Sequence, residues 1–173
     1  PPDEVNAPPF WAMYVGVPKL EDAASHIKRL GGKECSPVIE VPTVGRMQMM
    51  QDPQGAAFYI YEPAATEFPP EGAPEVGEGS WHELMTTDFR RAFEFYGALF
   101  GWEKIEEIDM GPLGKYFEYG MKGKMFGGMF NRPPEMANMN PFWLPYFHVK
   151  DVEESTAAAK KAGGFVQNGP MEV

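Results

Sequence analysis

The hydrophobic and polar positions along the chain predict three copies of one unit, a short strand followed by an amphipathic helix that ends at glycine. The units cover Pro9–Gly32, Trp81–Trp102 and Pro141–Gly164. In the central unit, residues 81–86 alternate as a strand with one buried face does. The helix that follows has apolar residues at three- and four-residue spacing, which places them on one helical face. This stripe begins after Asp88, a suitable N-cap, ends before Gly101, and consists of Ala92, Phe95, Tyr96 and Leu99.

Each of the first two units is followed by three short apolar or alternating runs, which predict strands. After the first unit they are residues 38–42, 44–51 and 56–63, and the turn-forming sequence DPQG joins the last two. After the central unit they are residues 103–110, 115–121 and 125–130. The predicted order is therefore βαβββ twice, followed by a third strand and helix.

A Pro-, Gly- and Glu-rich stretch separates the two complete units and has the composition of an extended connector. We therefore predict that residues 1–63 form the second βαβββ half of a first module, that residues 64–79 are a linker, and that residues 80–173 form a second module. That second module is incomplete at its C-terminal end, because no strands follow its last helix.

The first and third units repeat with a fixed offset. Nine residues of the first unit and the strand region after it recur 132 positions later. They are Phe10, Trp11, Tyr14, Val17, Glu21, Gly31, Gly32, Glu40 and Val41. A repeat of this length with two halves in each period predicts a fragment of a protein of about 260 residues. The alternative is a homodimer in which two chains exchange halves; the fragment is favoured over it, because the alternative leaves unpaired sheet edges that only an oligomer could cover.

The composition and net charge of the chain exclude some classes of binding partner. The chain carries 15 Lys and Arg against 25 Asp and Glu, a net charge of −10, and no basic cluster. Nucleic acid and anionic membranes attract basic surfaces, so we expect neither as a partner. The lone Cys35 excludes an intrachain disulfide and favours the cytoplasm, and no apolar run suggests a membrane span or leader. The 12 methionines fit either a soft core or an adaptable apolar pocket.

The paired βαβββ units, the helix motif from Asp88 to Gly101, and the DPQG turn resemble the vicinal oxygen chelate superfamily of glyoxalases, bleomycin resistance proteins and extradiol dioxygenases. The chain is most similar to its tandem two-module, glyoxalase-like members. The resemblance implies an α+β fold in which paired βαβββ modules form curled mixed β-sheets with helices on the outside. It also implies a cup-shaped cavity for a small molecule.

Many members of this superfamily bind a divalent metal in the cup, through His and Glu side chains on the strands. The corresponding positions here are Trp81, Leu144 and Tyr59, none of which is a His, Glu or Gln. His82 is one residue out of register and should face the helix, because strand residues alternate between faces. The resemblance thus implies a divalent metal as a possible cofactor, whereas the positions in this chain support no metal ligands.

The residues expected on the cup side form a polar and aromatic lining of the kind that binds small organic molecules. A carboxylate at Glu83 is either a general base or a group hydrogen-bonded to neighbours. Tyr146 and His148 are expected to assist it as catalytic residues. The expected substrate-binding residues are Trp81, Met85, Tyr14, Arg46 and Tyr59.

Two functions follow from this lining. One is an enzyme, a glyoxalase-like lyase or isomerase or a dioxygenase-like protein, that acts on a small oxygenated metabolite with Glu83 as its base. The other is a non-catalytic protein of the bleomycin-resistance type, which binds a drug or antibiotic by aromatic stacking. The fold resemblance favours the enzyme, and the ligand positions argue against a metal-dependent glyoxalase I.

Overall fold

A computed structural model describes residues 10–65 and 72–171 and shows an α+β protein with two five-stranded mixed sheets and three helices. The first sheet and its helix comprise β1 (Tyr14–Gly16), α1 (Leu20–Arg29), β2 (Lys33–Glu34), β3 (Ile39–Val41), β4 (Gly45–Gln51) and β5 (Ala57–Pro63). The second sheet and its helix α2 (Phe89–Phe100) comprise the strands β6 (Gly79–Thr86), β7 (Glu103–Asp109), β8 (Lys115–Met121), β9 (Lys124–Asn131) and β10 (Phe142–Phe147), and α3 (Val152–Lys161) follows. Two short 3-10 helices, η1 (Gly111–Leu113) and η2 (Pro134–Met136), lie between these strands. The α+β fold class predicted from the sequence is confirmed.

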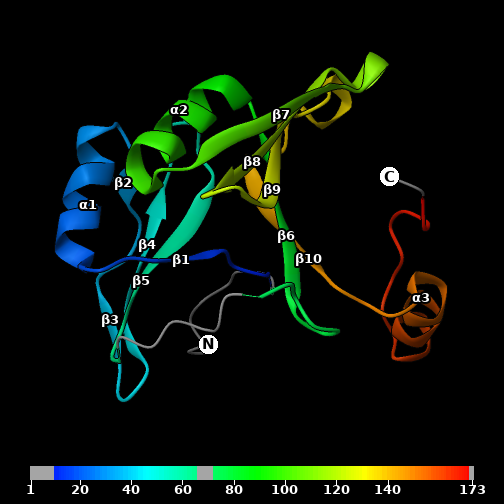
Figure 1. Cartoon of the computed structure of the whole chain (residues 1–173), viewed down its shortest axis with the longest axis horizontal. Coiled ribbons are helices and arrows are strands. Elements are labelled where there is room, and N and C mark those ends of the chain that lie inside the picture. The colour runs from blue at the N-terminus through cyan, green and yellow to red at the C-terminus, as the bar shows by residue number, and fades with distance from the viewer. Residues whose placement is uncertain (1–9, 66–71, 172–173) are drawn as a thin grey trace.

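Both sheets place the first strand of a βαβββ half beside its last strand. The order of the first sheet is β1-β5-β4-β2 with β3 on β4, and the order of the second is β10-β6-β9-β8-β7. The pairs β1–β5 and β6–β9 are parallel, as expected for strands joined through a helical crossover, whereas β10 runs antiparallel to β6. Figure 1 shows α1 and α2 over the sheets, and α3 set apart near the C-terminal end. The second sheet therefore joins two first strands, β6 and β10, edge to edge.

The 132-residue repeat is visible in the backbone. Helix α1 covers residues 20–29 and α3 covers residues 152–161, so both ends of the two helices differ by 132 positions. Each helix is followed by a glycine with positive φ, Gly31 at 90° and Gly163 at 92°. Equivalent sequence thus produces equivalent local structure in the two copies.

Helix α2 begins and ends at the residues that the pattern predicts. The Asp88 carboxylate accepts hydrogen bonds from the backbone N–H groups of Arg90 and Arg91, and Gly101 ends the helix in the left-handed conformation with φ 74°. The predicted stripe faces the core: Ala92, Phe95 and Tyr96 are buried. Asp151 caps α3 in the same way, through the N–H of Glu154.

The two sheets share one hydrophobic core, and the DPQG turn connects them. Buried residues of α1, β4 and β5 pack in the same cluster as those of α2, β8 and β9. From the turn, the Gln54 side-chain oxygen accepts hydrogen bonds from the hydroxyls of Thr86 and Thr87 and from the N–H of Asp88, and its Nε2 donates to the carbonyl of Asp88. One amide side chain of the turn between β4 and β5 thus fixes the junction between β6 and α2.

Two details differ from the predicted strands. The run from Phe10 to Val17 contains only a three-residue strand, because β5, the one strand paired with β1 among the described residues, aligns with residues 14–16. A further two-residue strand, β2, follows α1 and pairs with β4.

None of the helices in residues 10–65 and 72–171 has the length and apolar character needed to span a membrane.

Candidate functional site

A hydrogen-bonded cluster around Glu83 lies on the face of the second sheet away from α2. The Tyr116 hydroxyl donates to Glu83 Oε2 at 2.9 Å, and the Tyr146 hydroxyl donates to Glu83 Oε1 at 3.0 Å. Trp81 Nε1 donates in turn to the Tyr116 oxygen at 2.9 Å. These side chains come from β6, β8 and β10, and the chain of donors from Trp81 through Tyr116 ends at the carboxylate.

Glu83 also forms part of the wall of a cavity of about 440 Å³. This volume lies within the range of small-molecule sites, about 300–1,000 Å³. Most of the remaining wall is apolar and rich in methionine. The apolar lining residues are Met85, Met110, Phe130, Pro133, Met136, Phe142, Leu144 and Met171. The other polar groups in the wall are Lys115, Tyr116, Asn131, Tyr146 and Asn168, so the site combines an adaptable apolar surface with a few polar groups.

The two phenols that contact Glu83 act as donors at neutral pH. Burial and then the nearby Glu83 charge raise the pKa of Tyr146 to about 12. Burial is also the main cause of the raised pKa of Tyr116, and the Glu83 charge adds to it, although the bond from Trp81 lowers it. Protonated phenols hold the carboxylate in place, because each supplies a hydrogen bond to one of its oxygens.

Strand β6 alternates as the sequence predicts. Glu83 and Met85 line the cavity and Trp81 joins their cluster, whereas Leu84 is buried beneath α2. His82 lies on the same side as Leu84, with Nδ1 3.4 Å from the carbonyl oxygen of Phe126. Burial lowers its pKa, and the bond to Phe126 opposes this effect. His82 therefore faces away from the cavity.

The residues expected on the cup side of the first sheet divide into two groups. Tyr14 and Tyr59 stack on each other, with ring centroids 4.7 Å apart, on the face away from α1. Arg46 is on the opposite face, where it pairs with Glu21 of α1 and with Glu62 at 3.5 Å. The register of β4 against β5 explains the difference. Tyr59 lies opposite Met49, and Arg46 precedes Met49 by three positions, so its side chain points to the other face of the sheet.

His148 also lies apart from the Glu83 cluster. The sequence prediction assumed that side chains alternate between faces along the whole strand. The register of β10 against β6 shifts between Tyr146 and Phe147, however, and the strand ends at Phe147. The His148 ring lies instead within 2.9 Å of the carbonyl oxygen of Pro74. The structure thus brings together Trp81, Glu83, Met85 and Tyr146, and places His148, Arg46 and the Tyr14–Tyr59 pair elsewhere.

Sequence reasoning missed Tyr116, although one signal pointed to it. Gly127 and Gly128 interrupt β9, and paired glycines within a strand mark a close approach by another group. A side chain at Gly128 would overlap the Tyr116 hydroxyl, 2.0 Å from the ideal Cβ position. The glycine therefore leaves the space in which Tyr116 reaches Glu83.

The donor set in this cavity does not fit the divalent metal that the fold family implies. Among the described residues, no three His, Cys, Asp or Glu side chains converge as a metal site. The family's ligand positions hold Trp81, which donates to Tyr116, and Leu144, which contributes an apolar wall. A single carboxylate with both oxygens bonded to phenols is a poor substitute for a three- or four-ligand site.

Comparisons with known proteins agree with this architecture. The chain is 29% identical over 167 residues to "Putative glyoxylase CFP32" of Mycobacterium bovis, an alignment that covers 96% of the chain and 62% of the relative. It is 26% identical to the anthracycline biosynthesis protein DauV of Streptomyces sp. strain C5, over 98% of the chain and 60% of that protein. The chain thus spans about three fifths of the length of these relatives.

Solved structures give the same fold. The crystal structure of 2,2',3-trihydroxybiphenyl 1,2-dioxygenase from Sphingomonas wittichii strain RW1 matches with a TM-score of 0.59 and 12% identity, over 89% of this chain and 59% of that chain. At this identity the match concerns the fold alone. The family model for the Glyoxalase/Bleomycin resistance protein/Dioxygenase superfamily matches residues 80–173, which are more than half of the chain and include the whole Glu83 cluster. The chain is therefore a member of the glyoxalase/bleomycin resistance protein/dioxygenase superfamily.

Proposed function

We propose that the cavity beside Glu83 binds a small hydroxylated aromatic molecule without a metal ion. The observation that carries this proposal is the Glu83 carboxylate, held by Tyr116 and Tyr146 at the wall of a mostly apolar cavity. A carboxylate offers about four acceptor positions, and the two phenols use two of them. The others are available to a hydroxyl group on a bound molecule.

The apolar wall supports an aromatic ligand. Phe130 stacks beside Tyr116 with an interplanar angle of 25°, and Phe142 and several methionines complete the surface. Methionine adapts to flat rings and makes favourable sulfur–aromatic contacts. The relative DauV is named for anthracycline biosynthesis, and hydroxylated polycyclic aromatics combine a flat apolar body with hydroxyl donors.

The test is a calorimetric titration with 2,6-dihydroxynaphthalene, a flat aromatic molecule whose hydroxyls are free to donate. We expect Glu83→Gln to weaken binding about tenfold or more, because a hydrogen bond to a charged group contributes about 1.5–3 kcal/mol. Glu94→Gln is the matched control, since Glu94 is exposed on α2, away from the cavity. The 2,6-dimethoxy analogue, which has no hydroxyl to donate, should bind the unaltered protein as weakly as the dihydroxy compound binds Glu83→Gln. Equal affinities for the two compounds, or for the two variants, would contradict the proposal.

A second candidate is proton transfer by Glu83 on a carbonyl substrate, as in a glyoxalase-like lyase or isomerase. The supporting observation is that Glu83 is the only carboxylate in the wall of this cavity among the described residues. In such a reaction Glu83 would remove a proton from the carbon beside a carbonyl and return it to the neighbouring carbon.

Turnover of the hemithioacetal of methylglyoxal and glutathione tests this second candidate. We expect the unaltered protein to turn it over at equal rates with and without added nickel or zinc, and Glu83→Gln to lose at least 100-fold in kcat, as removal of a general base typically does. Absence of turnover of this substrate by the unaltered protein would contradict the second candidate.

A further inference from the structure

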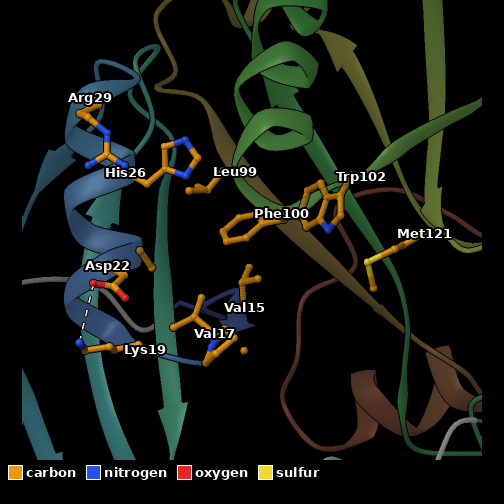
Figure 2. A pocket seen from close by; sticks show the side chains of 13 residues that line it. Val15, Val17, Lys19, Asp22, His26, Arg29, Leu99, Phe100, Trp102 and Met121 are labelled. Carbon is orange, nitrogen blue, oxygen red and sulfur yellow. Dashed lines mark ion pairs between the residues drawn. The ribbon is translucent and has the colours of Figure 1, made fainter.

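A second cavity, of about 570 Å³, opens between α1 and the C-terminal end of α2. None of its lining residues belongs to the cavity beside Glu83. Figure 2 shows α1 along one side of this groove and Leu99, Phe100 and Trp102 along the other. The groove is therefore a separate feature, formed where the two halves of the structure meet.

One wall of the groove is aromatic and aliphatic. Phe100 and Trp102 lie with ring centroids 5.3 Å apart, and Val15 and Met121 extend the same surface. Trp102 is buried and packs against Tyr96 and Tyr119, so this wall is anchored in the core. An anchored apolar wall is preformed and favours the apolar body of a ligand.

The opposite wall is formed by α1 and its N-cap residue Lys19, and three of its side chains are basic. Lys19, His26 and Arg29 recur at helical spacing and line the groove from one end of α1 to the other, over a length of about 15 Å. Figure 2 shows the His26 ring projecting toward Leu99, with Arg29 one turn further along. Lys19 lies 3.9 Å from Asp22, whereas Arg29 has no hydrogen-bond or ion-pair partner within the described part of the chain.

The charge of this wall differs from that of the protein as a whole. The chain has a net charge of −10, yet the groove contains the cations Lys19 and Arg29 against a single carboxylate, Asp22. A local excess of positive charge beside an apolar wall is complementary to a molecule with an anionic head and an apolar body. A cationic or neutral ligand would gain less from Arg29.

We propose that the groove between α1 and α2 binds an amphipathic organic anion, with its carboxylate at His26 and Arg29 and its apolar body along Leu99, Phe100 and Trp102. This site lies outside the cavity beside Glu83 and is independent of the proposed function. A fatty acid and an aryl carboxylate share the required chemistry, and the length of the groove accommodates either one.

The test is a calorimetric titration of the protein with dodecanoate and with 2-naphthoate, each below its aggregation concentration. We expect Arg29→Gln to weaken binding about five- to tenfold, and Lys28→Gln, the same charge change one residue earlier, to alter it less than twofold. Lys28 does not line the groove and pairs with Glu34. Dodecyltrimethylammonium, which has the same chain and an opposite charge, should bind at least tenfold more weakly than dodecanoate. Tighter binding of dodecanoate or of 2-naphthoate identifies the apolar body that the groove prefers.

A second pair of variants tests where the apolar body of the bound anion lies. Met121→Glu places a negative charge in the groove and should weaken binding as much as Arg29→Gln, whereas Met125→Glu, at a similarly exposed position outside the groove, should not. Glu83→Gln should leave dodecanoate binding unchanged. Equal affinity for the anionic and cationic amphiphiles, or equal loss in Arg29→Gln and Lys28→Gln, would overturn the proposal, as would full affinity in Met121→Glu.

Discussion

Replacement of Asp52 with alanine is expected to lower the free energy of unfolding by about 3 kcal/mol. Asp52 is 2% exposed, and its Oδ1 accepts hydrogen bonds from the N–H groups of Gln54, Gly55 and Ala56. Its Oδ2 accepts from the Tyr96 hydroxyl at 3.1 Å. Removal of the carboxylate leaves several buried donors without an acceptor, and each unsatisfied group costs about 1–3 kcal/mol, partly offset by relaxation of the turn.

Urea denaturation followed by circular dichroism measures this loss. Asp22→Ala is the matched control, because Asp22 is exposed and makes only a 3.9 Å ion pair, so its replacement should change stability by about 0.5 kcal/mol or less. The double variant Asp52→Ala with Tyr96→Phe should lose less than the sum of the single losses, since the two residues share one hydrogen bond. Strict additivity, or equal stability of Asp52→Ala and Asp22→Ala, would show that this contact does not join the two halves.

The role of Asp52 illustrates the limit of sequence reasoning for the fold. The DPQG sequence predicts a turn because Asp, Pro and Gly favour turn geometry, and residues 52–55 do connect β4 and β5. Two residues of this turn also contact α2: Asp52 accepts a hydrogen bond from Tyr96, and Gln54 accepts one from Asp88 at the start of the helix. Their partners are 44 and 34 positions away, and no local pattern specifies which distant element a turn will contact. Local chemistry therefore predicted the turn, and tertiary packing gave it a second role.

The candidate site was predictable where a strand is regular. Alternation along β6 placed Glu83 and Met85 on one face, because successive residues of an extended strand point to opposite sides. The same reasoning failed for His148, which follows the register shift after Tyr146, and for Arg46, which faces α1 rather than the side of Tyr59. A single irregularity or a miscounted residue reverses the face of every position beyond it.

The repeat shows how equivalent positions acquire different surroundings. Tyr14 and Tyr146 are 132 residues apart and lie on the equivalent strands β1 and β10. Tyr146 is beside β6 and donates to Glu83, whereas Tyr14 is beside β5 and stacks on Tyr59. A repeat therefore predicts local backbone structure, while the neighbouring strand determines the chemistry of each copy.

Replacement of Gly127 with alanine is expected to cost about 4 kcal/mol in the free energy of unfolding, from overpacking together with the loss of a hydrogen bond. The new Cβ would lie 2.2 Å from the Tyr119 hydroxyl and 2.4 Å from the carbonyl oxygen of His82. These two groups bond to each other at 3.1 Å, so one methyl group would separate them. Tyr119 is completely buried and stacks on Trp102, which leaves it no space to move. Denaturant midpoints and slopes measure the loss.

The adjacent Gly128 provides the matched comparison, because it receives the same substitution on the opposite face of β9. Its new Cβ would overlap the Tyr116 hydroxyl, but Tyr116 is only half-buried and can rotate into the cavity. We therefore expect Gly128→Ala to cost about 1 kcal/mol in stability. It should also weaken 2,6-dihydroxynaphthalene binding about tenfold, since Tyr116 would leave Glu83 and occupy ligand space. Calorimetry and denaturation of both variants separate the two effects. Similar stability losses at the two glycines, with ligand affinity intact in Gly128→Ala, would mean that β9 adjusts its backbone and that Tyr116 does not set the geometry of Glu83.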